Sequence, residues 1–148
     1  MSEVHVEIEI ATPVQRVWET IMNPDRLKDW VTIHRSVGHV SEPLTKGSTM
    51  EQELRMRGVS FKVNWTLVDV SAPTTAQWDG RGPARSRARI RYELSPRGDD
   101  RTLFKYTNAF TPPGGMLGNV ASRVIVGAAS EREANGSLSR LKALLERD

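Results

Sequence analysis

The sequence contains no cysteine among its 148 residues, which excludes disulfides, thiolate nucleophiles and cysteine-ligated zinc. Histidine is also scarce, with three in the chain. His34 and His39 are five residues apart, a spacing that puts them on opposite faces of a strand, and His5 falls on the polar face of the first predicted strand. The histidines therefore make a poor set of metal ligands, and we predict neither a metal site nor a cofactor.

Long apolar runs are absent as well. The uncharged segment 107–122 is interrupted by two prolines and three glycines, and a membrane helix needs about 20 apolar residues. The first residues do not show the basic-then-apolar pattern of a secretion signal. The net charge of +3 is too small to indicate a dedicated nucleic-acid binder. We therefore expect one soluble, cytoplasmic domain over residues 1–148, with no integral membrane association; the oligomeric state stays open.

The N-terminal third shows signals for one strand and two short helices. Apolar and polar residues alternate over residues 4–10, which predicts a strand with one polar face. Thr12 as N-cap and Pro13 at the first helical position are typical of a helix start. The pair Asn23-Pro24 ends this helix and begins a second one, which runs to about Asp29.

Six strands and one long helix are predicted in the remainder of the chain. The strands lie at about 33–40, 49–57, 59–67, around Trp78, at 85–94 and at 102–110, with Gly58 as a hairpin turn. A single helix is then expected from about Pro113 to Arg147. Strands in succession with helices at the ends are typical of an α+β fold with an antiparallel sheet. Seven strands curl strongly, and only the last helix is long enough to cover the concave face.

Two short motifs resemble a known family. The first is Thr12-Pro13-x-x-x-Val17-Trp18, and the second is Asn23-Pro24-Asp25-Arg26-Leu27-x-x-Trp30. Together they resemble the opening of the START-like, or SRPBCC, helix-grip superfamily, which includes polyketide cyclases and lipid-transfer domains. The resemblance implies a curved seven-stranded antiparallel sheet around a long C-terminal helix, with two short helices after strand 1. Segment 28–35 is similar to an actinobacterial branch that includes a mycobacterial toxin, and this implies a possible antitoxin partner.

The final helix directs one acid toward the sheet if it is continuous. At 100° per residue, Val120 and Glu131 fall on its inner face, and Met116 and Val124 lie slightly farther out. Glu131 then contacts a ligand or a water in a pocket, pairs with an inward arginine, or turns to solvent at a local kink.

Aromatic residues dominate the predicted inner face of the sheet. The candidates for a pocket lining are Trp65, Trp78, Tyr92, Phe104, Tyr106, Asn108 and Phe110. Ordinary core packing explains each aromatic equally well, whereas an inward polar group such as Asn108 needs a partner. His34 either faces the pocket or makes a local hydrogen bond.

The arginines of 85–91 form an outer face, with Glu51, Glu53 and Glu93 as partners, or else bind phosphate-bearing polymers.

Three functions fit these patterns. The first is binding of a small hydrophobic or amphipathic molecule between the sheet and the final helix, with an entrance near 112–115. The second is an enzyme similar to aromatic polyketide cyclases, with Glu131 and Tyr106 as acid–base groups and Asn108 orienting the substrate. The third is a toxin of a type II toxin–antitoxin pair, which the family resemblance alone implies. The sequence favours binding over catalysis, because it offers few ionisable residues inside the pocket.

Overall fold

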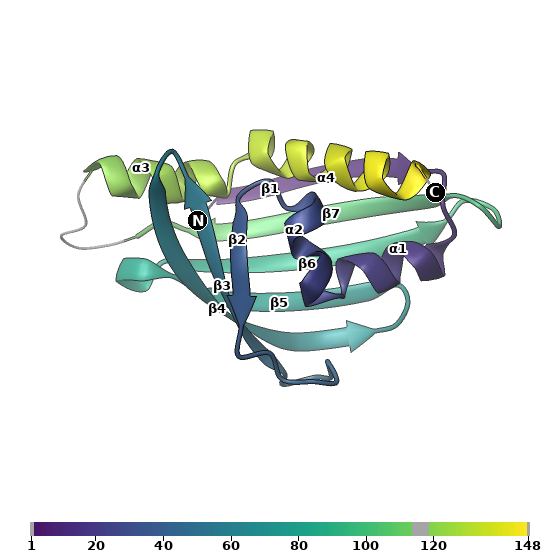
Figure 1. The fold of residues 1–148 in the computed structure, drawn as a ribbon, viewed down its shortest axis with the longest axis horizontal. Helices are drawn as coiled ribbons and strands as arrows, with labels where there is room; N and C mark the ends of the chain where they lie inside the picture. Colours follow the sequence, from purple (N-terminus) through teal and green to yellow (C-terminus); the bar gives the residue numbers. More distant parts are fainter. Residues whose placement is uncertain (1, 114–118, 148) are drawn as a thin grey trace.

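The computed structural model describes the backbone of residues 2–113 and 119–147, and the side chains of residues 3–113 and 123–147. Figure 1 shows the order of the elements along the chain. They are β1 (Ser2–Ile10), α1 (Val14–Ile21), the 3-10 turn η1 (Pro24–Arg26), α2 (Leu27–Trp30), β2 (His34–Gly38), β3 (Thr49–Met56), β4 (Val59–Ser71), β5 (Thr75–Arg81), the 3-10 turn η2 (Pro83–Arg85), β6 (Arg87–Pro96), β7 (Thr102–Thr111), α3 (Asn119–Ala128) and α4 (Glu131–Glu146).

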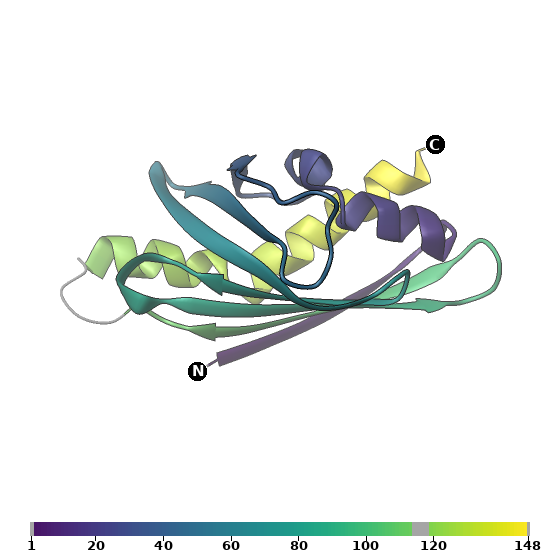
Figure 2. The ribbon, with the colours of Figure 1, turned by 90° about the horizontal axis from the view of Figure 1, so that it is seen from below.

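The strands form one antiparallel sheet in the order β1-β7-β6-β5-β4-β3-β2. Figure 2 shows the helices on one side of this sheet, with β2 and β3 curling toward them. The first strand pairs with the last, so that Ser2 lies opposite Phe110 and Ile10 opposite Thr102. The predicted α+β class, the seven-stranded antiparallel sheet and the short helices after strand 1 are confirmed.

The C-terminal region contains two helices instead of the one predicted over 113–147. The break lies at Ser130, whose backbone is extended at φ −81° and ψ 160°. Its Oγ accepts a hydrogen bond from the Glu133 backbone N–H at 3.3 Å, which makes Ser130 the N-cap of α4. Helix α4, with 16 residues, is the long C-terminal helix that packs on the sheet.

The start of α1 also differs from the prediction. Pro13, and not Thr12, is the N-cap, since its backbone is still extended at ψ 148°. The buried Thr12 hydroxyl instead lies 2.8 Å from the Ala11 carbonyl oxygen and 3.3 Å from that of Leu145. The chain before α1 is thus tied to the end of α4. The predicted role of Asn23 is confirmed, because its Oδ1 accepts from the Asp25 N–H at 3.0 Å.

An aromatic cluster joins α2 to the sheet. The Trp30 ring meets Tyr92 and Phe104 edge-on, with centroids 6.2 Å and 6.4 Å away. Tyr92 and Phe104 lie on the adjacent strands β6 and β7, with centroids 5.5 Å apart. Edge-to-face pairs at these separations stabilise a core beyond the area that they bury. The cluster therefore fixes α2 over strands β6 and β7.

Candidate functional site

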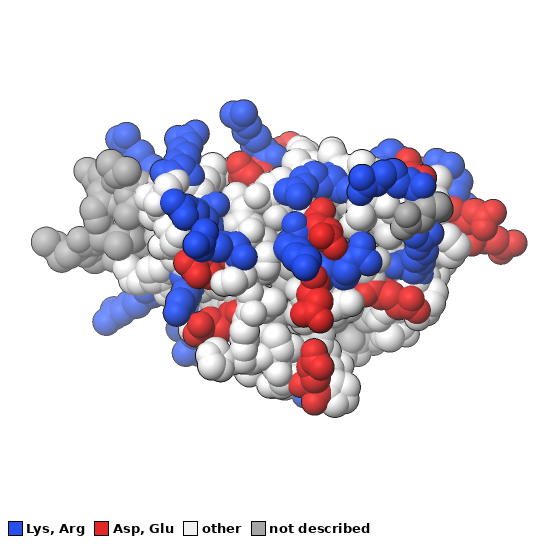
Figure 3. Space-filling model, viewed as in Figure 1, with Lys and Arg blue, Asp and Glu red and all other residues white. Residues whose placement is uncertain are grey.

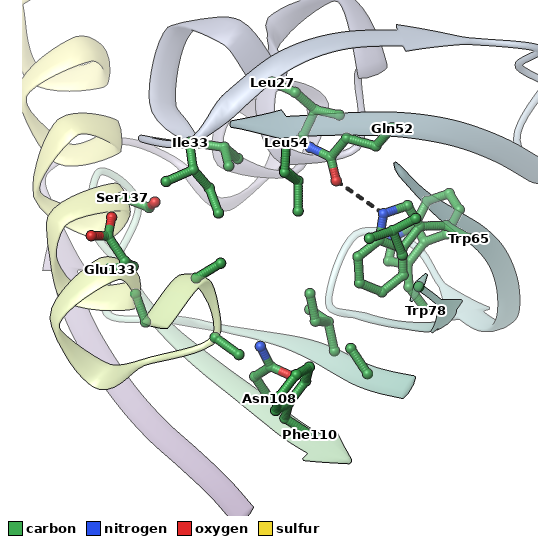
Figure 4. Close-up of a pocket in the computed structure, with 18 of the residues that line it drawn as sticks. Leu27, Ile33, Gln52, Leu54, Trp65, Trp78, Asn108, Phe110, Glu133 and Ser137 are labelled. Carbon is green, nitrogen blue, oxygen red and sulfur yellow. Dashed lines mark hydrogen bonds between the residues drawn. The ribbon is translucent and has the colours of Figure 1, made fainter. Parts of the chain in front are cut away.

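A pocket of about 120 Å³ lies between the concave face of the sheet, α2 and the junction of α3 with α4. Figure 4 shows its lining side chains converging from these elements. The walls are mainly apolar and include Leu27, Ile33, Leu54, Phe61, Val63, Trp65, Trp78, Ile90, Phe110 and Ile125. One buried water needs roughly 15 Å³, so this space can hold a small organic molecule.

Trp65 reaches its place in the wall because Gly80 lies directly across the β4–β5 ladder. A Cβ atom on Gly80 would lie 2.6 Å from two carbons of the Trp65 ring and 2.8 Å from a methyl group of Val63. Real Cβ atoms do not approach ring carbons this closely. Glycine at this strand position is therefore what allows the indole ring to pack against the backbone of β5.

A hydrogen-bonded chain runs from this indole to a histidine. Trp65 Nε1 donates to Gln52 Oε1 at 2.9 Å, as Figure 4 shows, and Gln52 Nε2 lies 2.9 Å from His34 Nδ1. An indole N–H can only donate, so the amide oxygen must face Trp65 and the NH₂ group must face His34. Nδ1 of His34 is then an acceptor, and the ring is neutral with its proton on Nε2. Half-burial lowers the pKa of His34, which favours the same neutral state.

Two buried polar atoms in the pocket lining have no hydrogen-bond partner among the described residues. They are the indole Nε1 of Trp30 and the amide Oδ1 of Asn108. The exposed fraction of Trp30 is 1% and that of Asn108 is 6%. A buried polar group without a partner costs about 1–3 kcal/mol, so native proteins rarely retain one without a use for it.

Two tyrosines stand side by side beneath the pocket. The rings of Tyr92 and Tyr106 are 6.1 Å apart, and both residues line the space. Burial raises the pKa of both phenols. The adjoining Tyr106 raises the pKa of Tyr92 further, whereas a hydrogen bond with the Asn108 side chain opposes the rise in the pKa of Tyr106. Both are therefore neutral near pH 7, where a phenol can donate a hydrogen bond but cannot act as a base.

The structure brings half of the predicted site residues together. Trp65, Trp78, Tyr92, Tyr106, Asn108 and Phe110 line the pocket. Phe104 does not, because it is fully buried under Trp30 and Tyr92. Val124 is buried without lining the pocket, where its neighbour Ile125 is found instead. His34 hydrogen-bonds to Gln52 and does not line the pocket. Met116 and the side chain of Val120 lie outside the described residues and side chains.

Glu131 does not point toward the sheet: of the alternatives predicted, the structure shows the one in which a break in the helix turns this acid to solvent. Glu131 is exposed at the first position of α4, because the break at Ser130 resets the rotation on which the prediction depended. The acid that lines the pocket is Glu133, whose Oε2 accepts from the Thr32 hydroxyl at 2.8 Å. Ser130 and Glu133 have the spacing of a capping box, S-x-x-E, and this motif was the sequence signal for a new helix that begins after Ser130.

The arginines on the outer face of β6 have fewer partners than predicted. Arg89 pairs with Asp79 at 3.0 Å and Arg91 with Glu93 at 2.8 Å. The other two expected acids pair elsewhere, since Glu51 contacts Lys62 at 3.5 Å and Glu53 contacts Arg35 at 3.7 Å. Exposed pairs of this kind contribute little to stability.

Two searches of the described residues were negative. No helix in residues 2–113 or 119–147 is long and apolar enough to cross a membrane. No group of three or more histidine, aspartate or glutamate side chains in the same ranges is arranged to hold a metal ion. The polar residues that line the pocket carry hydroxyls, amides, indoles, one carboxylate and the guanidinium of Arg87.

Residues 1–146 match the family described as polyketide cyclase/dehydrase and lipid transport, and the chain belongs to this family. Among solved structures it is similar to the Zhui aromatase/cyclase of a Streptomyces species, with TM-score 0.82 and 15% identity over 99% of this chain and 94% of that one. A START superfamily protein of Mycobacterium smegmatis gives TM-score 0.77 and 12% identity over 98% and 97%. These likenesses establish the START-like helix-grip fold.

A more distant similarity is to curated proteins of Mycobacterium tuberculosis. Toxin Rv0910 of strain H37Rv and Toxin MT0934 of strain CDC 1551 are each 22% identical over 98 residues. The match spans 66% of this chain and 68% of each relative.

The contact between Gly80 and Trp65 is tested by Gly80→Ala. The added methyl group must displace a rigid ring, which we expect to lower the free energy of unfolding by about 1–3 kcal/mol. It should also change the near-ultraviolet circular dichroism of the tryptophans. Gly38→Ala is the matched control, because a Cβ there meets no atom within 4 Å. Equal losses in the two variants would contradict the packing described.

The hydrogen bond between Gln52 and a neutral His34 predicts that the stability of the protein depends on pH. The folded protein binds a proton at His34 less tightly than the unfolded chain does, so the free energy of unfolding falls as the pH drops below about 6.5. Urea unfolding between about pH 7.5 and about pH 5.5 should show this loss. We expect His34→Asn to flatten it and His39→Asn, an exposed control, to retain it. If the free energy of unfolding of His34→Asn still falls with pH as in the wild type, a group other than His34 causes the loss.

Proposed function

We propose that this protein binds a small, mainly apolar molecule that carries a hydroxyl or carbonyl oxygen. The observation that carries the proposal is an apolar pocket in which two buried polar atoms, Trp30 Nε1 and Asn108 Oδ1, lack a partner among the described residues. Membership of the polyketide cyclase/dehydrase and lipid transport family is consistent with such a ligand.

The two polar atoms specify complementary chemistry. The indole N–H of Trp30 is a donor and calls for an oxygen acceptor, whereas the amide oxygen of Asn108 calls for a donor. A ligand hydroxyl can accept from Trp30 or donate to Asn108. A ligand with a hydroxyl beside a carbonyl can do both at once. A plain hydrocarbon would leave both atoms unsatisfied, so the site should discriminate against it.

The apolar walls supply the greater part of the binding free energy. Trp65, Trp78 and Phe110 present aromatic surface from three strands, and each Å² of apolar surface removed from water contributes about 25 cal/mol. The polar atoms then orient the ligand within the apolar space, as polar groups do in most small-molecule sites.

Catalysis of the kind found in a cyclase receives less support. Its proposed acid, Glu131, is exposed and does not line the pocket, and the Tyr106 phenol, neutral near pH 7, could donate a proton or a hydrogen bond but could not act as a general base. A toxin role with an antitoxin partner is a separate proposal. It rests on the 22% identity to proteins named toxins, and the pocket geometry does not bear on it.

Occupancy of the pocket is tested with N-phenyl-1-naphthylamine, a neutral dye that fluoresces in apolar surroundings. Wild-type protein should bind it, and Ala88→Trp should weaken binding at least tenfold, because Ala88 lines the pocket and the larger ring fills it. The control is Ala109→Trp on the opposite face of the adjacent strand β7, a position that does not line the pocket. Equal affinity in Ala88→Trp and wild type would show that the dye binds elsewhere.

The role of Asn108 is tested by comparing 2-naphthol with naphthalene, which differ by one hydroxyl group. Wild-type protein should prefer 2-naphthol by about tenfold, the effect of one buried hydrogen bond. Asn108→Leu, of similar size, should abolish the preference and still bind naphthalene. Isothermal titration calorimetry or competition with the dye measures both affinities. An unchanged preference in the variant would remove Asn108 from the proposed recognition.

A further inference from the structure

The pocket contains a single acid. On the face of the molecule drawn in Figure 3, Lys and Arg side chains are interspersed with Asp and Glu. Among the described residues that line the pocket, by contrast, Glu133 is the one carboxylate. Arg87 also belongs to the lining, but it alternates with Ala88 along β6, so its side chain lies on the outer face of the sheet. The charge that a ligand meets in the pocket is therefore negative.

Capping of α4 does not account for the position of this carboxylate. In a complete capping box, the acid at the third helical position accepts a hydrogen bond from the backbone N–H of the N-cap residue. Here the N–H of Ser130 donates instead to the Gly127 carbonyl oxygen at 3.1 Å. Glu133 contributes only its own backbone N–H to the cap, and its side chain is turned to Thr32.

Hydroxyl groups surround the carboxylate on the same wall. Thr32, Ser130 and Ser137 all line the pocket beside Glu133. The Thr32 hydroxyl donates its proton to Glu133 Oε2, and its oxygen has two lone pairs, of which Ser137 Oγ at 3.4 Å can use at most one. Glu133 Oε1 has neither a hydrogen bond nor an ion pair among the described residues. Two acceptors, Glu133 Oε1 and Thr32 Oγ1, are thus open to a ligand.

These acceptors and the aromatic wall belong to one space. Figure 4 shows Glu133 and Ser137 on α4 at one side of the pocket and Trp65 and Trp78 at the other side, with Asn108 below. A molecule whose apolar body packs against the two indole rings can therefore present a terminal group to α4 without leaving the pocket.

We propose that Glu133, with Thr32 beside it, binds an ammonium group on a ligand whose apolar body occupies the pocket. An ammonium group has only donors, so it matches the two open acceptors, and its hydrogen bond to a carboxylate is stronger than one between neutral groups. A ligand hydroxyl has a single proton to donate and leaves the carboxylate charge unpaired. This inference rests on the proposed function and narrows the ligand to an apolar amine.

Two naphthalene derivatives that differ in one functional group test the ammonium site. 1-Naphthylmethylamine carries an ammonium group near pH 7 where 1-naphthalenemethanol carries a hydroxyl. In competition with N-phenyl-1-naphthylamine, wild-type protein should bind the amine about tenfold more tightly than the alcohol at low salt. Glu133→Gln should abolish this preference and keep the affinity for the alcohol, because the glutamine amide oxygen can still accept from Thr32.

Glu131→Gln is the matched control, since Glu131 is on the same turn of α4 but is exposed and does not line the pocket. This variant should retain the preference for the amine. Loss of the preference in both variants would overturn the site, because the general charge at the start of α4 would then cause the effect.

The remaining outcomes separate the two proposals. If the dye and both naphthalene derivatives fail to bind wild-type protein, the proposed function is overturned and this inference with it. If all three bind but the wild type does not prefer the amine, or if Glu133→Gln prefers it as strongly as the wild type, only the ammonium site is overturned. Unchanged affinity for the neutral dye shows that Glu133→Gln is folded, and the wild-type preference tests the site independently of that variant.

Discussion

The pocket depends on the contact that holds the start of α4 against the end of α2. Thr32 follows α2, and its backbone N–H donates to Ser137 Oγ at 3.1 Å while its hydroxyl donates to Glu133 at 2.8 Å. Both acceptors lie on the first two turns of α4. This contact sets where α4 begins to cover the sheet. The two residues that join α3 to α4, Ala129 and Ser130, line the pocket. The break between α3 and α4 is thus part of the pocket wall, which one continuous helix would not form in this way.

Two kinds of polar group meet in this pocket. The Trp65–Gln52–His34 chain is internally satisfied, so it stiffens the wall and presents little to a ligand. Trp30 and Asn108 differ, because rigid neighbours hold them in place while one atom of each stays without a partner among the described residues. Preorganised groups of this kind recognise a ligand at low entropic cost. Tryptophan and amide side chains thus occur in two settings: Trp65 and Gln52 are hydrogen-bonded to each other, whereas Trp30 Nε1 and Asn108 Oδ1 have no partner among the described residues.

Much of the fold followed from local patterns. Alternation with period two located the strands, and the Asn23 cap marked the second helix, because these signals depend on neighbours in the sequence. The helix break was missed since its signal, Ser130 with Glu133, is one weak motif within a long apolar pattern. Phe104 was misplaced because period two identifies the inner face of a strand but not the depth along it. The contacts of Thr32 with α4 join residues about 100 positions apart, and no sequence pattern reports them.

The pairing of β1 with β7 has a consequence for synthesis of the chain. Strand β1 is at the edge of the sheet, and its neighbour β7 lies roughly 100 residues later. Helix α4, which also packs on β1, comes later still. As the ribosome releases the chain, β1 cannot pair until β7, at residues 102–111, has been made. The nascent protein therefore carries an unpaired strand with one apolar face while roughly 100 further residues are added, a state in which chaperones act on growing chains.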